Sequence, residues 1–200
     1  MGPTHESGIP GLRVQPGEHI CAIYRNREER DDVMLPFLRE GLRSGDKCIC
    51  LVRSTPSSDV LADLCDACEV DDCVASGQLE VLSSREADRR PDPFSTNEML
   101  ARWETSVGAA MKSGRFSFAR LTGEMPPPAN DLVDREQLFR SESELERFAS
   151  RYPQIVLSLY DLNDFGGGIV IDLLKTHPKV LLANQVLESL HWVSPDELPL

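Results

Sequence analysis

The sequence predicts an α/β fold, in which a three-layer, mostly parallel sheet carries helices on both faces. Short, apolar, β-prone runs recur along the chain, and segments with apolar residues at helical spacing lie between most of them. The composition is that of a globular protein, with 40% hydrophobic and 27% charged residues. Helices of about 10 to 20 residues between strands favour right-handed crossovers and therefore a parallel sheet.

The strands are predicted from short apolar runs. The run IVLSLY is the most convincing, because every position but the serine is apolar or aromatic. In chain order, the predicted strands cover residues 19–24, 47–52, 79–82, 116–121, 155–160 and 180–183.

Helices are predicted between these strands. Apolar residues from Met34 to Leu42 have helical spacing, but Pro36 means that this helix either starts near Asp32 or kinks. Ser95 and Glu98 have the spacing of a capping box at the start of a helix that Gly114 ends. The other helices are expected at about residues 57–68, 134–152 and 169–175.

Residues 1–17 are rich in glycine and proline and contain no apolar core, so we expect a flexible tail that is neither signal peptide nor anchor. Residues 18–200 are expected to form one domain, because no linker or repeat divides them. No stretch approaches the roughly 18 apolar residues that span a bilayer. We therefore expect a cytoplasmic protein, in which the six cysteines are thiols.

The formal net charge of −12 argues against direct binding to nucleic acid or to an anionic membrane, since both require a positive surface. Catalytic motifs are also missing. The sequence contains neither G-x-S-x-G nor H-E-x-x-H, and its carboxylates show no pairing that indicates acid–base chemistry. The composition thus favours a binding protein over an enzyme, and no cofactor is expected.

The turn after the first strand lacks phosphate-binding chemistry. A P-loop would place G-x-x-x-x-G-K-[ST] there, because glycines let backbone N–H groups wrap the phosphates and the lysine neutralises them. Residues 24–30 read YRNREER instead, with no glycine, no lysine and two carboxylates. The three glycines at 166–168 also lack a lysine and are typical of a hinge. The sequence therefore does not predict a Walker-type ATPase.

Several motifs occur in the order of a known family. They are HICAIY at 19–24, Glu28-Glu29, PFLREGL at 36–42 with Gly45 and Cys48, RLTGEM at 120–125, Glu136, Tyr160-Asp161 with Phe165, and His177-Pro178. This set resembles the MEDS family of sensory domains from methanogen and methylotroph regulators, over about residues 18–197. The family is similar to the KaiC/RecA-like ATPases, so the resemblance implies that scaffold without its P-loop. Prolines follow Met125 where relatives often carry a tryptophan.

Ligand-binding residues are expected at the carboxyl ends of the strands, where open α/β sheets bind ligands. Arg120 and Glu124 are predicted to flank the end of the fourth strand, either as a polar clamp on a ligand or as an internal ion pair. His177 is either a proton or metal site or a hydrogen-bonded structural residue, and His19, at the amino edge, is given a structural role. The candidate ligand-binding residues are Tyr24, Arg25, Arg120, Glu124, Tyr160, Asp161 and His177. For Tyr24 and Tyr160, core packing is the alternative, and for Asp161 it is capping of a loop.

The cysteines are interpreted first as small buried hydrophobic residues. Cys65, Cys68 and Cys73 form a C-x2-C-x4-C pattern, but no fourth ligand follows nearby to complete a zinc site. A metal or redox sensor built on these three cysteines remains the alternative.

The resemblance implies a regulatory sensor that binds a small organic ligand or signal. We expect such a sensor to pass the signal to a protein partner, in a kinase or anti-sigma pathway, or to a second copy of the chain. A residual nucleotide-binding ATPase relative is the alternative function, beside the cysteine-based sensor.

Overall fold

The computed structural model describes residues 4–53, 55–65, 70–83, 96–126, 135–183, 185–190 and 192–193. A seven-stranded sheet in the order β5-β4-β6-β7-β3-β8-β9 forms the middle layer, and every pair is parallel except β8 with β9. The strands are β3 (His19–Tyr24), β4 (Lys47–Val52), β5 (Leu79–Ser83), β6 (Ala119–Glu124), β7 (Gln154–Asp161), β8 (Lys179–Leu182) and β9 (Gln185–Glu188).

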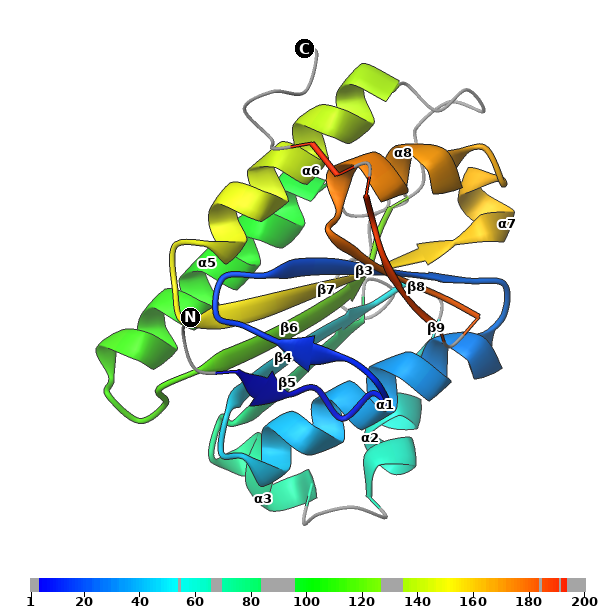
Figure 1. Ribbon diagram of the computed structural model, residues 1–200. Coiled ribbons are helices and arrows are strands. Elements are labelled where there is room, and N and C mark those ends of the chain that lie inside the picture. Colours follow the sequence, from blue (N-terminus) through cyan, green and yellow to red (C-terminus); the bar gives the residue numbers. More distant parts are fainter. Residues whose placement is uncertain are drawn as a thin grey trace.

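Helices cover both faces of the sheet (Figure 1). One face packs against α1 (Arg27–Arg43), α2 (Ser57–Leu64) and α3 (Val70–Ala75). The other face packs against α5 (Thr96–Lys112), α6 (Arg135–Ala149), α7 (Leu162–Phe165) and α8 (Ile169–Thr176). Alternation along the strands divides the core accordingly, so that Ile20 and Ala22 of β3 face α1 while Cys21 and Ile23 face α6 and α8. The predicted three-layer α/β architecture is therefore confirmed.

The strand predictions agree with the structure apart from the fourth. That strand starts at Ala119 instead of Phe116 and continues through Thr122, Gly123 and Glu124. This stretch reads as a turn in the sequence, but β4 and β7 pair with it on both sides. A Cβ at Gly123 would come within 2.9 Å of the Trp103 ring, so glycine lets α5 pack closely on the strand.

The helices also differ from the predictions at their ends. Helix α1 begins at Arg27, one turn earlier than expected, and contains Pro36 in its interior. Its start is stabilised by Asn26, whose side chain accepts the backbone N–H of Glu29. Helix α2 ends at Leu64, short of the predicted Cys68, which lies outside the described residues. Ser95, the predicted cap of α5, also lies outside them.

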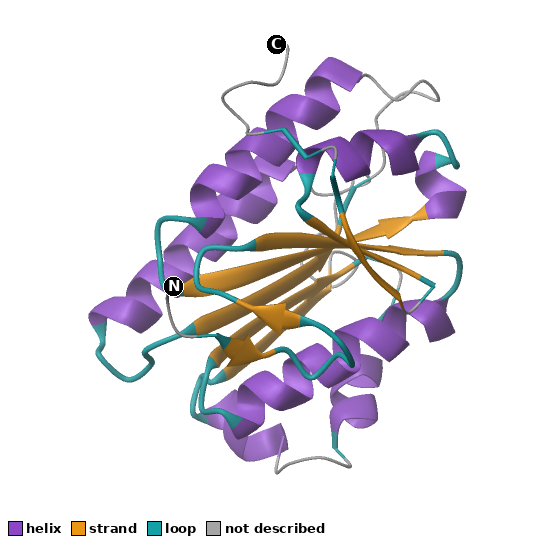
Figure 2. Cartoon of the chain, in the orientation of Figure 1, coloured by secondary structure: helices purple, strands orange, loops and turns teal. Residues whose placement is uncertain are grey.

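Residues 4–17 differ most from the expectation of a flexible tail. Strands β1 (His5–Glu6) and β2 (Arg13–Val14) pair as an antiparallel hairpin, which Figure 2 shows in front of the sheet. The side chains of Ile9, Leu12 and Val14 are buried in the core on the α1 face. These three apolar residues lie among glycines and prolines and make no periodic pattern, so tertiary packing alone explains why this segment is folded.

Within the part of the chain that the structure describes, no helix is both long and apolar enough to cross a bilayer.

Candidate functional site

The turn between β3 and α1 is closed by its own side chains. The carboxylate of Glu29 accepts the backbone N–H of Arg25 at 2.9 Å and the Nε–H of the Arg25 guanidinium at 2.9 Å. Asn26 accepts the Glu29 N–H, as described above. The backbone N–H groups of Arg25 and Glu29, which a bound anion could use at this helix start, thus already donate to side chains of the turn.

A second network lies at the carboxyl end of β6. Glu124, the last residue of the strand, is 3% exposed, and its Oε1 accepts a hydrogen bond of 2.5 Å from Arg30 Nη1. The backbone N–H of Arg53 donates to the other oxygen of the same carboxylate. Burial works against the Arg30 charge, but Glu124 and Asp31 outweigh it and hold the pKa of Arg30 above its ordinary value. The charged side chains of Arg30 and Glu124, with the backbone N–H of Arg53, therefore hold α1, β4 and β6 together.

Sequence reasoning missed Arg30. Its position on α1, four residues before Met34 and seven before Phe37, puts it on the buried stripe of that helix. An arginine on an apolar stripe signals a buried carboxylate partner, and that signal was present in the sequence.

Tyr24 and Asp161 lie beside this network, as expected for residues that end neighbouring strands. Tyr24 is 7% exposed, and burial, followed by the charges of Glu124 and Asp161, raises the pKa of its hydroxyl. The side chain of Asp161 accepts the backbone N–H of Asn163 at 2.9 Å and caps α7, so the capping interpretation is confirmed. The structure thus gathers Tyr24, Arg25, Glu124 and Asp161 at one edge of the sheet.

Arg120 was predicted at this edge, but that placement is wrong. It lies near the amino end of β6, four residues before Glu124, and is 1% exposed. Its guanidinium donates to Asp46 at 2.7 Å and to the carbonyl oxygens of Glu6 and Ser7 in the hairpin. Arg120 and Glu124 are therefore two separate buried charges with different partners, and the predicted clamp between them does not form.

Tyr160 and His177 lie on the opposite face of the sheet, where they meet in one buried cluster. The Tyr160 hydroxyl donates to Glu142 on α6, and His177 Nε2 lies 3.0 Å from Glu142 Oε2. Burial works against an imidazolium at His177, but Cys21 and Glu142 outweigh it and raise the pKa of His177 well above its ordinary value. His19 joins the cluster through Ser158 on β7, at 2.8 Å. Burial, followed by the charge of His177, lowers the pKa of His19 to about 3.

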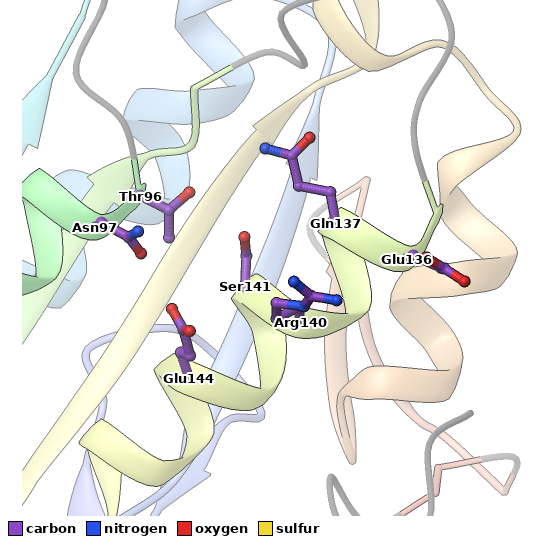
Figure 3. A pocket seen from close by; sticks show the side chains of 7 residues that line it. All are labelled: Thr96, Asn97, Glu136, Gln137, Arg140, Ser141 and Glu144. Atoms are coloured by element: carbon purple, nitrogen blue, oxygen red, sulfur yellow. The ribbon is translucent and has the colours of Figure 1, made fainter. Parts of the chain in front are cut away.

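A pocket opens between the first turns of α5 and α6 and has a volume of about 430 Å³ (Figure 3). In the chain, α5 follows β5 and α6 follows β6. Polar side chains surround the pocket, and sequence reasoning placed none of them in a site, although Glu136 belongs to the family motifs, since exposed polar residues on helices carry no distinguishing pattern. The lining residues are Thr96, Asn97, Glu136, Gln137, Arg140, Ser141 and Glu144.

The cysteines fall into two groups. Cys21, Cys48 and Cys50 are fully buried on strands, as the interpretation of small hydrophobic residues requires. Cys65 is exposed and Cys73 is partly buried, while Cys68 lies outside the described residues. Cys21 faces α6, whereas Cys48 and Cys50 face α1, so the three buried thiols do not share a face.

Comparison with known families gives the class of protein, a sensory domain. Residues 18–178 match the family described as MEDS, the methanogen/methylotroph, DcmR sensory domain, so the chain belongs to that family. The chain is 28% identical over 173 residues to the transcriptional repressor DcmR of Methylorubrum extorquens strain DM4. The match covers 84% of this chain and 61% of the repressor, so the chain spans about three fifths of its curated relative.

Among solved structures, the chain is similar to a KaiC-like protein from the hyperthermophilic archaeon Pyrococcus horikoshii OT3. The TM-score is 0.63 at 14% sequence identity, and the match covers 91% of this chain and 81% of that protein. A likeness at this identity shows the fold alone. It confirms the KaiC-like, RecA-type scaffold that the family resemblance implied.

Proposed function

We propose that this chain is a regulatory sensor that binds a small polar organic compound in the pocket between α5 and α6. The sensory family supplies the class of function. The observation that carries the site is the pocket, which is lined by polar side chains of α5 and α6. Its volume of about 430 Å³ falls within the range of roughly 300–1,000 Å³ that small-molecule sites occupy.

The lining indicates the chemistry of the compound. Thr96 and Ser141 offer hydroxyls, Asn97 and Gln137 offer amides, and Arg140 stands opposite the carboxylate of Glu144 across one turn of α6. Such a wall both donates and accepts hydrogen bonds, and it carries both signs of charge. It suits a compound with hydroxyl, amine or carboxylate groups better than it suits a hydrocarbon.

The closed turn after β3 supports a sensor over an ATPase. A nucleotide in the position of a P-loop substrate would have to displace Glu29 from Arg25 and bring its own phosphates next to the Glu28 and Glu29 carboxylates. Repulsion between the negative phosphates and these carboxylates opposes binding. The retained scaffold is therefore proposed to serve recognition, with no hydrolysis of ATP.

A thermal-shift screen tests the proposed function. The panel contains small alcohols, halocarbons, amino acids, organic acids and nucleotides with Mg²⁺, and a compound that binds only the folded chain raises the melting temperature. At 100 times its dissociation constant, a compound stabilises the chain by roughly 2.7 kcal/mol. We expect a hit among the polar organic compounds.

The site is then tested with variants. Arg140→Ala and Ser141→Ala are expected to remove the shift, while Arg115→Ala, an exposed arginine beyond the far end of α5, is expected to retain it. A shift that survives both pocket variants but disappears in Glu124→Gln would move the site to the strand ends. A shift with ATP that requires Mg²⁺ would replace the sensor by the nucleotide-binding alternative.

The relay to a partner has its own readout. Size-exclusion chromatography with light scattering, with and without the hit compound, separates the two proposed outputs. A change in mass indicates self-association, and an unchanged mass leaves a separate regulatory protein as the proposed partner.

A further inference from the structure

The buried cluster on the α6 face contains more nitrogen and oxygen atoms able to bind a metal ion than its hydrogen bonds use. His19, Glu142 and His177 come from β3, α6 and the turn between α8 and β8, and each is at most 2% exposed. One ligand atom from each residue lies within 4.8 Å of the other two. His19 and Glu142 are 123 positions apart in the chain, and Glu142 and His177 are 35 positions apart, so only the fold brings them together.

The distances in this cluster fit a tetrahedral metal ion. Glu142 Oε2 lies 3.0 Å from His177 Nε2 and 3.9 Å from His19 Nδ1. Zinc binds nitrogen and oxygen at about 2.0–2.2 Å, so the ligands of a tetrahedral zinc ion are separated by roughly 3.3–3.6 Å. The observed separations bracket that value.

The two imidazoles are held as metal ligands usually are. His177 Nδ1 lies 3.1 Å from the carbonyl oxygen of Leu173, and an N–H on that nitrogen leaves Nε2 to face Glu142. His19 Nε2 is held at 2.8 Å by Ser158, which leaves Nδ1 directed toward the carboxylates of Glu142 and Glu146. Each ring is therefore fixed through one nitrogen and presents the other to the same space.

Polar atoms in that space lack partners. Among the described residues, His19 Nδ1 and Glu146 Oε2 are buried atoms with no hydrogen bond. Glu146 Oε2 lies 3.7 Å from His19 Nδ1, and the Glu146 side chain, 24% exposed, connects the cluster to solvent. Burying unpartnered polar groups and a second carboxylate is costly, and a divalent cation would offset that cost.

The donor set favours zinc. His19 and His177 supply two imidazole nitrogens and Glu142 supplies a carboxylate oxygen, and imidazole suits zinc better than it suits magnesium or calcium. The Glu146 carboxylate, whose Oε2 lies 3.7 Å from His19 Nδ1, is placed to supply a fourth oxygen.

We propose that His19, Glu142 and His177 bind one zinc ion inside the domain. The ion joins β3, α6 and the start of β8, and it is separate from the pocket at the ends of α5 and α6. This site differs from the cysteine pattern at Cys65, Cys68 and Cys73, because it uses none of those residues.

Metal analysis of the full chain tests the proposal. The chain is produced without a metal-binding tag and purified without chelator, and we expect about one equivalent of zinc by mass spectrometry. After chelation, added Zn²⁺ is expected to raise the melting temperature. Added Co²⁺ is expected to give the visible bands of a tetrahedral ion.

Near-isosteric variants locate the ion even if alanine variants unfold. His19→Gln and Glu142→Gln are each expected to weaken zinc binding by about 10- to 100-fold or more. His5→Ala removes a histidine outside the cluster, and Cys65→Ser removes an exposed thiol; both controls are expected to bind as the unaltered chain does.

Two results would overturn the proposal. The first is a chain that holds no zinc as purified and shows no thermal shift with added Zn²⁺ after chelation, which would leave the cluster as a His177–Glu142 ion pair. The second is zinc that is retained in His19→Gln and Glu142→Gln but lost in Cys65→Ser, which would assign the ion to the cysteine pattern at Cys65, Cys68 and Cys73.

Discussion

Arg120 is a buried charge whose partners come from three separate parts of the chain. Asp46 precedes β4, Glu6 and Ser7 belong to the hairpin, and the ring of Phe37 on α1 lies 5.4 Å from the guanidinium carbon. Gly41 makes room for it, since a Cβ there would lie 2.6 Å from Arg120 Cδ. The residue therefore links the hairpin, α1 and the sheet, and its role is one of stability.

Arg120→Met tests this role. Removing the guanidinium leaves Asp46 buried without its cation, and breaking such a pair typically costs about 3–5 kcal/mol. Urea unfolding is the measurement, with Arg115→Met as an exposed arginine control that is expected to change stability by no more than about 0.5 kcal/mol. In the double variant Arg120→Met/Asp46→Asn, the two costs are expected to be less than additive. Strict additivity would mean that the pair is not coupled.

At the scale of elements, the hairpin depends on a glycine. Gly8 has φ of 84°, and a Cβ at this position would lie 2.2 Å from the carbonyl oxygen of Pro36 on α1. Gly11 has a similar φ of 78°, but a Cβ there would meet nothing within 4 Å.

These two glycines make a matched pair of variants. Gly11→Ala is expected to cost about 1–2 kcal/mol, because only the backbone conformation opposes it. Gly8→Ala meets the same conformational cost and must also push the hairpin away from α1, so we expect it to be clearly more destabilising. Urea unfolding measures both. Equal losses would show that the hairpin does not pack on α1 as closely as the structure has it.

The elements also show how far a sequence predicts such a fold. Six of the seven strands of the main sheet were predictable because parallel strands are buried on both faces and read as apolar runs such as IVLSLY. The edge strand β9 and the hairpin were not, because their strands are only two to four residues long and contain few apolar residues. Tyr24, Glu124 and Asp161 were placed correctly because strand ends follow from topology. Glu142, with its partners on other elements, could not be predicted by that rule.

At the scale of the whole molecule, the thiols divide into those buried in the core and those that solvent can reach. Cys48 and Cys50 are completely buried between β4 and α1, and burial, followed by the charge of Glu124, raises the pKa of Cys50 to about 12. Burial likewise raises the pKa of Cys48. Cys65, at the end of α2, is exposed.

Thiol labelling therefore reports on unfolding of the whole domain. In the folded chain at pH 8, we expect a disulfide reagent to modify Cys65 quickly and to modify Cys48 and Cys50 only at the rate of global unfolding. Peptide mass spectrometry assigns each site. As the pH rises above the ordinary thiol pKa of 9, the unfolded chain loses protons that the folded chain keeps, so stability falls. Labelling of Cys50 as fast as that of Cys65 would contradict the packing of this face.

The folding unit extends beyond the segment by which the family is recognised. That segment ends at Pro178, one residue before β8, and begins after the hairpin. A fragment cut at those two points would lack β8, so β3 would have an unpaired edge along Cys21–Ile23. It would also lack the hairpin, so the apolar residues that pack against Ile9 and Leu12 would be exposed to solvent. A chimeric regulator that carries this domain therefore needs residues 4–188 at least. A shorter fragment would be prone to associate through the unpaired edge of β3.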